Sequence, residues 1–467
     1  MNSDKKKTFS RREFLRYSSL AASAAVLSAC GAASTQPANA PPAAPATTEG
    51  GAAAPPAPEA KTFEAWYQAT GLAEESIKEI LARYNQENKG GITVKPVYIP
   101  ETTGTQSDPK LLTAIAGGTP PALNYFDRFI VPQFAQQGFL TKITDQAKAA
   151  GVKADDYFSF AWEEATYKGD LYALPFDTDT RALWYNKDIM KEAGLDPEKP
   201  PTNIKELEEM TEALTVRDAQ KRITRYGFNP LFDQAWSYTW GFDWKGEFQD
   251  PETKRITTAH PKNVEALDWV ASFVQKIGVE DIDAMIAACT GTACNDANDY
   301  FWTGQAAMTC SGNWKVAQSH QYKPDTNYGV VPMPGPDGPA PHASWAGGWS
   351  WVIPSGIEDV DAAFDALNFM CGPIGQDMYN KKTFHIPTHK KAAEDPFYRK
   401  DPLHAVFMDL LPVSHTRPPI PAGSLLWDEL YKAFRDDIPH GKKTAKEALT
   451  AIDEKVNASL EEMGFFA

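Results

Sequence analysis

The chain's most suggestive chemical groups are two carboxylates and one guanidinium in the segment LPFDTDTRALWYNKD. Asp177, Asp179 and Arg181 occupy alternate positions, so in a β-strand all three side chains lie on one face. Two acceptors beside a five-donor guanidinium suit a ligand rich in hydroxyl groups. A structural ion pair between Asp179 and Arg181 explains the same spacing. A third interpretation is a glycosidase carboxylate pair, although such pairs usually come from separate elements.

Aromatic residues gather in the segment SWAGGWSWVIP, where Trp345, Trp349 and Trp351 surround Gly347 and Gly348. In an extended strand all three rings would lie on one face. Glycine inside a strand often marks a place where a ligand or another backbone comes close. Core packing beside a bend is the alternative, and this segment taken alone favours core packing.

Motifs of several common enzyme classes are absent from the sequence. It contains no G-x-S-x-G, H-E-x-x-H, G-x-x-x-x-G-K-[ST] or G-x-G-x-x-G. His385 and His389 have the i, i+4 spacing of a helical metal pair, but Pro387 lies between them and argues against a helix. We therefore expect these histidines to be solvent-exposed, and we expect no metal site, no cofactor and no catalytic residue.

The N-terminus has the pattern of an export signal. Residues 1–29 place basic residues before a short stretch of Ala, Ser, Leu and Val that is too short to span a bilayer. SRREFLR resembles the twin-arginine motif, and LSAC resembles a lipobox in which Cys30 becomes the lipidated first residue. Residues 30–60 are rich in Ala and Pro and should form an extended tether. These patterns predict an exported protein anchored by lipid at the outer face of the cytoplasmic membrane.

Composition limits the classes of partner and the number of domains. The formal net charge of −15 argues against binding to nucleic acid or to a membrane surface through basic residues. Residues 61–467 exceed what one hydrophobic core usually serves, so we expect two domains. Outside the cytoplasm, Cys289 and Cys294 are able to close a small disulfide loop. Cys310 and Cys371 are predicted to be buried single thiols.

Helix and strand patterns alternate along this body, which predicts an α/β fold. Residues 73–86 place Ile77, Ile80, Leu81 and Tyr84 on one helical face, and residues 91–100 follow as a strand. A further strand is expected at residues 122–126. Helices are expected at residues 200–214, with Thr202 as N-cap, and at residues 260–279 and 358–373.

Several longer segments resemble one protein family. YKGDLYALPFDTDTRALWYNKD, AIAGGTPPALNYFDRF, FWTGQAAMTCSGNW and YGVVPMPGP are similar to segments of the family 1 extracellular solute-binding proteins of ABC transporters. The resemblance is to the carbohydrate-binding group that includes maltose-binding proteins, and it covers nearly all of residues 61–467 in order. It implies a monomer with a type II-like periplasmic-binding-protein fold of two α/β lobes.

The resemblance also implies how the chain divides between the lobes. Lobe 1 should comprise residues 61–175 and 345–386, and lobe 2 residues 176–344 and 387–467. The lobes should be joined by a hinge of crossing segments near residues 174–178, 343–348 and 384–389, and should close over a ligand in the cleft.

By the same resemblance, Trp314 and Trp349 should stack against a sugar, while the charged residues bind its hydroxyl edge. The expected ligand-contacting residues are Trp66, Tyr67, Asp127, Asp179, Arg181, Trp236, Trp314, Gly347, Trp349 and Arg417. The implied function is capture of a mono- or oligosaccharide and its delivery to permease subunits in the membrane. Two alternatives remain. One is a receptor for a polyol phosphate, polyamine or peptide, and the other is a lipid-anchored glycoside hydrolase using Asp177 or Asp179.

Overall fold

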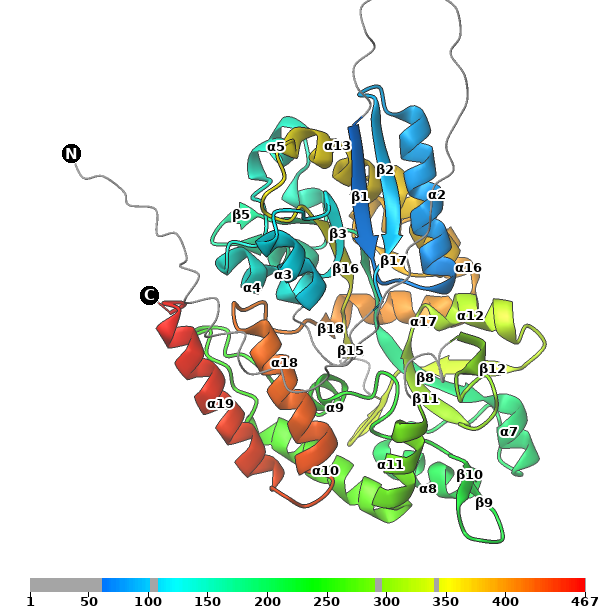
Figure 1. Cartoon of the computed structure of the whole chain (residues 1–467). Helices are drawn as coiled ribbons and strands as arrows, with labels where there is room; N and C mark the ends of the chain where they lie inside the picture. Colours follow the sequence, from blue (N-terminus) through cyan, green and yellow to red (C-terminus); the bar gives the residue numbers. More distant parts are fainter. Residues whose placement is uncertain (1–60, 101–107, 290–295, 340–343, 467) are drawn as a thin grey trace, which may run out of the picture. The chain divides into compact units, whose positions relative to one another are not determined.

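The computed structural model describes residues 61–100, 108–289, 296–339 and 344–466, and its helices and strands alternate along the chain as an α/β fold requires (Figure 1). The predicted signal peptide, Cys30 and the tether lie outside these residues, as does Cys294. Cys289, which caps the C-terminal end of a helix, is disulfide-bonded. Among the described helices, none has both the length and the apolar character needed to cross a membrane.

A five-stranded sheet, called here the first sheet, organises one hydrophobic core. Its strands, in spatial order, are β2 (Ile92–Tyr98), β1 (Lys61–Tyr67), β3 (Leu123–Asp127), β16 (Trp349–Val352) and β6 (Ala173–Pro175). β1 pairs in parallel with β2 and β3, whereas β16 runs antiparallel to both of its neighbours. A strand from the second half of the sequence therefore lies between two strands from the first half.

The helix α2 (Gly71–Glu87) packs on this sheet with the predicted stripe of Ile77, Ile80, Leu81 and Tyr84, all of them buried (Figure 1). Other elements around this sheet are α3 (Pro109–Ala116), η1 (Arg128–Ile130), α4 (Val131–Gln136), α5 (Thr144–Ala149), η2 (Ala154–Asp156), α6 (Ser159–Glu164), β4 (Thr166–Tyr167), β5 (Asp170–Leu171), α13 (Val360–Cys371) and α14 (Pro373–Thr383).

The second sheet has the order β11 (Met308–Gly312), β8 (Arg181–Asn186) and β12 (Tyr328–Val331). Every residue of the central strand β8 is buried, because its two faces enter two different cores. Leu183 and Tyr185 enter one core, and Ala182 and Trp184 enter the other.

The elements around the second sheet fall into groups by core. The core that Leu183 and Tyr185 enter is completed by α7 (Lys187–Glu192), α8 (Ile204–Leu214), α9 (Ser237–Asp243), α10 (Pro261–Ile277), α11 (Val279–Ala288), α18 (Gly423–Lys432), η5 (Ala433–Asp437) and α19 (Ala445–Glu462). The core that Ala182 and Trp184 enter is completed by α12 (Lys315–Tyr322), α15 (Lys390–Ala393), α16 (Phe397–Lys400), α17 (Pro402–Leu410) and η4 (Leu411–Val413). Short pieces are β9 (Val216–Arg217), β10 (Ile223–Arg225), η3 (Asp296–Asn298), β13 (Pro334–Gly335) and β14 (Gly338–Pro339).

Most predicted elements are present, with one shift at a helix start. Asn203, rather than Thr202, caps α8, because the Asn203 side chain accepts a hydrogen bond from the backbone N–H of Glu206. Thr202 lies one residue earlier, where its N–H and hydroxyl bind the Glu206 carboxylate. The prediction of Thr202 as N-cap is therefore wrong by one residue.

Short segments that connect the two sheets lie side by side. β7 (Asp177–Thr178) pairs with β17 (Ile386–Pro387), and Asp179 forms an isolated bridge with Gly347. β15 (Ser344–Trp345) pairs with β18 (Ser414–His415) before the chain enters β16. The predicted crossing region at residues 174–178 thus contacts each of the other two, through β17 and through Gly347. The predicted lobe boundaries stay a prediction.

A fully buried arginine binds these connecting segments. The Nη1 of Arg128 donates to the carbonyl oxygen of Asp177 at 2.7 Å, and its Nη2 donates to that of Gly347 at 2.9 Å. Its Nε donates to the buried carboxylate of Glu164 at 2.7 Å. One guanidinium therefore fixes the spacing between two of the segments that connect the sheets.

The Asp177 carboxylate adds a second link between the same connecting segments. Its Oδ1 accepts from the Trp349 backbone N–H at 2.8 Å, and its Oδ2 accepts from the Tyr125 hydroxyl at 3.2 Å. Burial raises the pKa of Asp177 to about 7, against the opposing effect of the bond from the Trp349 N–H.

The three tryptophans of SWAGGWSWVIP do not share one face, as a continuous strand would require. Gly348 has φ of +137°, which turns the chain between β15 and β16. Trp345 packs in a core of the second sheet and Trp351 in the core of the first sheet. The structure therefore corrects the prediction that the three rings lie together.

Gly348→Ala should destabilise the fold by more than about 1 kcal/mol, because the φ angle is unfavourable for alanine. A Cβ there would also lie 2.3 Å from the Asp177 carbonyl oxygen. Gly441→Ala is the matched control, since Gly441 has φ of +66° with open space around its Cβ position. Urea unfolding should show the larger loss for Gly348→Ala; equal losses would contradict the close packing of the two chains.

The raised pKa of Asp177 makes its effect on stability dependent on pH. Because the folded state holds this proton more tightly than the unfolded state, the contribution of Asp177 is greatest at low pH. It is lost as pH rises toward 7, at up to about 1.4 kcal/mol per pH unit. The difference in unfolding free energy between wild type and Asp177→Asn should therefore decline from pH 5 to pH 7 and then level off. A difference that is independent of pH would show that Asp177 ionises normally in the folded protein.

Candidate functional site

A cavity of about 430 Å³ opens where the connecting segments meet the two sheets. One wall comes from the chain after β1, from β3 and from the start of β16. The opposite wall comes from the start of β8, the loop before α9, and one face of α12. Lining residues include Gln68, Thr70, Tyr125, Asp127, Asp179, Arg181, Gln234, Trp236, Asp296, Trp314, Gln318, Trp345, Gly347, Trp349, Tyr379, His385, Arg417 and Trp427.

Flat rings line much of this cavity, and several are held in place by a second ring. Trp349 stacks on Tyr125 with centroids 4.7 Å apart and an interplanar angle of 11°. Trp314 stacks on His385 at 5.7 Å and 18°. Trp236 packs at a tilt against Trp427 at 5.5 Å. Each paired ring is fixed in orientation before any ligand arrives.

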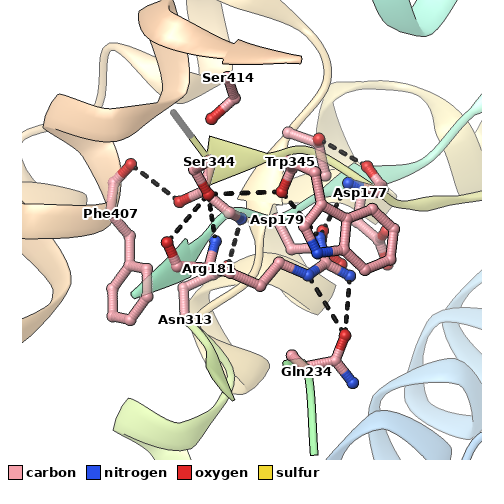
Figure 2. Close-up of polar contacts among 12 residues, drawn as sticks. Asp177, Asp179, Arg181, Gln234, Asn313, Ser344, Trp345, Phe407 and Ser414 are labelled. Carbon is pink, nitrogen blue, oxygen red and sulfur yellow. Dashed lines mark hydrogen bonds and ion pairs between the residues drawn. The ribbon is translucent and has the colours of Figure 1, made fainter. Parts of the chain in front are cut away.

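The ion pair suggested by the sequence forms on the cavity wall. In Figure 2, Arg181 extends between Asp179 and Gln234, with the Trp345 ring against its guanidinium. Arg181 Nη1 donates to the Asp179 carboxylate, and Nε and Nη2 donate to Gln234 Oε1 at 3.3 and 3.2 Å. The guanidinium carbon lies 3.6 Å from the Trp345 ring centroid. Burial lowers the pKa of Arg181, against the opposing effect of Asp179.

A second buried ion pair closes another side of the cavity. Arg417 donates from Nη2 and Nη1 to the two carboxylate oxygens of Asp127, at 2.7 and 3.0 Å. The guanidinium carbon also lies 4.3 Å from the Phe129 ring centroid. Asp127 ends β3 and accepts the N–H of Phe129, so the strand end itself orients this carboxylate.

The charges that line the cavity nearly balance. Both guanidiniums are paired with carboxylates, and Asp296 adds a third acidic group. No lysine is among the described residues that line it. The cavity therefore offers polar groups and rings, without an excess of positive charge.

The structure brings eight of the predicted ligand-contacting residues to this cavity: Asp127, Asp179, Arg181, Trp236, Trp314, Gly347, Trp349 and Arg417. Trp66 and Tyr67 do not line it, which corrects the sequence-based expectation. The Tyr67 ring turns into the core of the first sheet, and its hydroxyl donates to Glu74. The Trp66 indole donates to Glu64 and lies beneath the Lys110 ammonium. Gln68, Ala69 and Thr70 occupy the cavity edge instead.

Sequence reasoning missed several lining residues, of which His385 is the clearest. It was expected to be exposed, yet it is only 9% exposed and lies under Trp314. Pro387 does prevent a helix here, but β17 (Ile386–Pro387) begins at the next residue and pairs with β7, and His385 lies buried just before it. Trp427 could have been found from the sequence, because it lies next to the buried Leu426 in the amphipathic helix α18.

Other candidate groups lie away from the cavity. Asp177 is 0% exposed and does not line it. Cys310 and Cys371 are buried free thiols, which confirms their predicted state. Within the described residues, no cluster of three or more His, Cys, Asp or Glu side chains is arranged to hold a metal ion.

Solved structures with this architecture include sugar-binding proteins. CpMnBP1, solved with mannobiose bound, is 26% identical with a TM-score of 0.75, over 85% of this chain and 100% of that one. An ABC transporter solute-binding protein from Thermotoga lettingae, bound with alpha-D-tagatose, has a TM-score of 0.71 at 23% identity, over 85% of this chain and 99% of that one, which shows the fold alone. The chain thus has the two-lobed α/β fold of periplasmic sugar-binding proteins.

Sequence comparison finds relatives that are periplasmic binding proteins. The sn-glycerol-3-phosphate-binding periplasmic protein UgpB of Escherichia coli (strain K12) is 26% identical over 437 residues, covering 85% of this chain and 92% of the relative. The sequence profile of the bacterial extracellular solute-binding proteins matches residues 79–406, more than half of the chain. The chain therefore belongs to the bacterial extracellular solute-binding protein family.

Proposed function

We propose that this protein is the receptor of an ABC importer and that it captures a neutral carbohydrate in the cavity for delivery to the membrane permease. The observation that carries the proposal is the cavity itself, where oriented rings stand beside polar groups whose charges are already paired. CpMnBP1, at 26% identity, was solved with mannobiose bound, which supports a sugar as ligand.

A pyranose matches these two kinds of group. Its C–H face is apolar and packs on an aromatic ring, which contributes about 25 cal/mol per Å² of apolar area buried. Its edge carries hydroxyl groups that both donate and accept hydrogen bonds. Asp179 and Asp127 accept, and Arg181 and Arg417 donate, so a hydroxyl finds either partner nearby. A ligand that lacks a matching hydroxyl leaves buried polar groups unpaired, which gives selectivity.

The relation to UgpB raises glycerol 3-phosphate as a second candidate ligand. A phosphate dianion needs clustered basic groups or the N-terminus of a helix. Here both guanidiniums that line the cavity already bind carboxylates, and no lysine is among the described residues that line it, although the first turn of α2 reaches the cavity through Thr70, Leu72 and Ala73. The pairing of the basic side chains thus favours a neutral sugar, and the α2 N-terminus is the reason to test glycerol 3-phosphate beside it.

The proposed role is binding without turnover. A glycosidase would need one carboxylic acid and one carboxylate free to flank a bond. Asp177 is fully buried, and the Asp179 carboxylate binds Arg181 and the Gly347 N–H. Hinge closure of two lobes over the ligand requires no such pair.

We further propose that the chain is exported by the twin-arginine route and held at the outer face of the membrane through Cys30, with residues 30–60 as a tether. This proposal rests on the sequence pattern of residues 1–60. A Cys30→Ser variant should then be recovered free of the membrane.

A ligand screen tests the proposed function directly. The apparent melting temperature of the purified protein should rise with a neutral mono- or disaccharide, because a ligand that binds only the native state stabilises it. Mannobiose, maltose and sn-glycerol 3-phosphate belong in one panel, and the bound sugar should be recovered chemically intact. A shift with glycerol 3-phosphate alone would overturn the carbohydrate assignment, and a cleaved sugar would overturn the receptor role.

Trp349→Ala should weaken binding of the sugar found in that screen by about 10- to 100-fold, the effect of losing one buried aromatic face. Trp66→Ala is the matched control, because Trp66 lies outside the cavity on β1, a strand of the same sheet that β3 separates from β16. Isothermal titration calorimetry should show wild-type affinity for the control. Equal affinities for wild type and Trp349→Ala would remove this ring from the site.

A further inference from the structure

His385 combines a position on the cavity wall with an unsatisfied ring nitrogen. The residue is 9% exposed, it lines the cavity, and its Nδ1 is buried with no hydrogen-bond partner among the described residues. A buried polar atom without a hydrogen-bond partner is unfavourable for the folded state.

The backbone around His385 is fixed by an uncommon conformation. Phe384, the preceding residue, has φ of +57°, a left-handed conformation that is costly for a bulky residue. Its carbonyl oxygen accepts from the Asn313 side chain at 2.7 Å and lies 2.9 Å from His404 Nε2. These contacts hold the chain in a strained geometry that carries the imidazole to the cavity.

Two aromatic rings set the plane of the imidazole. Trp314 stacks on it at 5.7 Å, and Tyr379 lies at 5.5 Å with a tilt of 39°. Because Trp314 is a proposed stacking surface for the sugar, a ligand on that ring comes next to His385. The two side chains thus supply a flat face and a polar group at one place.

The imidazole is neutral over the physiological range of pH. Burial lowers the pKa of His385 to about 4, and Asp179 and Arg181 act on it in opposite directions. The other titratable groups near it are Tyr379 and His404. A neutral imidazole has one N–H donor and one bare nitrogen acceptor, so it binds a hydroxyl group and gives no charge to attract a phosphate.

We infer that His385 is a ligand-binding residue that forms a hydrogen bond with a hydroxyl group of the neutral sugar stacked on Trp314. This inference rests on the proposed function and extends it, since it names the group that selects an uncharged hydroxyl at this position. The missing partner of the imidazole is then supplied by the ligand.

Two variants separate a ligand-binding role from a structural one. His385→Phe keeps a flat ring against Trp314 and removes both nitrogens, whereas His385→Gln keeps a donor and an acceptor. With mannobiose and maltose as probes, His385→Phe should lose at least about 10-fold in affinity, and His385→Gln should recover part of the loss. The ligand-free His385→Phe protein should unfold at a temperature no lower than wild type, because an unpaired buried nitrogen has been removed. Wild-type affinity in His385→Phe would overturn the inference, and so would a lower unfolding temperature with unchanged affinity.

A spectroscopic test uses a second histidine as its control. In ¹⁵N-labelled protein, the imidazole nitrogen resonances of His385 should shift when mannobiose or maltose is added. Those of His404, whose ring nitrogens already lie 2.6 and 2.9 Å from carbonyl oxygens, should stay in place. A sugar that binds without moving the His385 signals would contradict the inference alone. If no sugar binds wild type at all, the carbohydrate assignment fails first, and a destabilised ligand-free His385→Phe then assigns His385 a structural role.

Discussion

The arrangement of the cavity depends on the hydrogen bonds that the Arg128 guanidinium donates. This guanidinium is fully buried and donates to the carbonyl oxygens of Asp177 and Gly347, which belong to two different connections between the sheets. Its charge is matched by the buried carboxylate of Glu164, which offsets the desolvation cost of a buried cation. With these two backbones held together, the chain has room for only a glycine at position 348, and Trp349 begins its strand facing the cavity.

The charged residues of the cavity are also paired. Asp179 neutralises Arg181, and Asp127 neutralises Arg417, before a ligand binds. A buried ion pair contributes little net stability, but it holds oriented donors and acceptors without an excess of charge. Stacked rings beside such pairs give the cavity wall an apolar part and a hydrogen-bonding part. These match the apolar face and the hydroxyl edge of a sugar.

Much of this arrangement is visible in the sequence, for reasons that are local. The stripe of α2 follows from helical periodicity, and the spacing of Asp179 and Arg181 follows from the alternation of a strand. That they contact Gly347 and line the same cavity as Asp127 was available only through family resemblance, because these residues are far apart in the sequence. The exposure of His385 was predicted wrongly, since local sequence cannot tell that the distant Trp314 will pack on its ring. Likewise, the face of the sheet to which the Tyr67 side chain points depends on the register of β1, and a shift of one residue reverses that face.

The pairing of the rings across the cavity has an optical consequence. Trp314 on the second-sheet side stacks on His385, which contacts Tyr379; the Tyr379 hydroxyl lies 3.0 Å from that of Tyr125, and Tyr125 in turn stacks on Trp349. This series of aromatic side chains runs from one wall of the cavity to the other and ends in an indole on each. Any molecule that enters between those indoles changes the polarity around them, so the protein carries an intrinsic fluorescent reporter of its own occupancy.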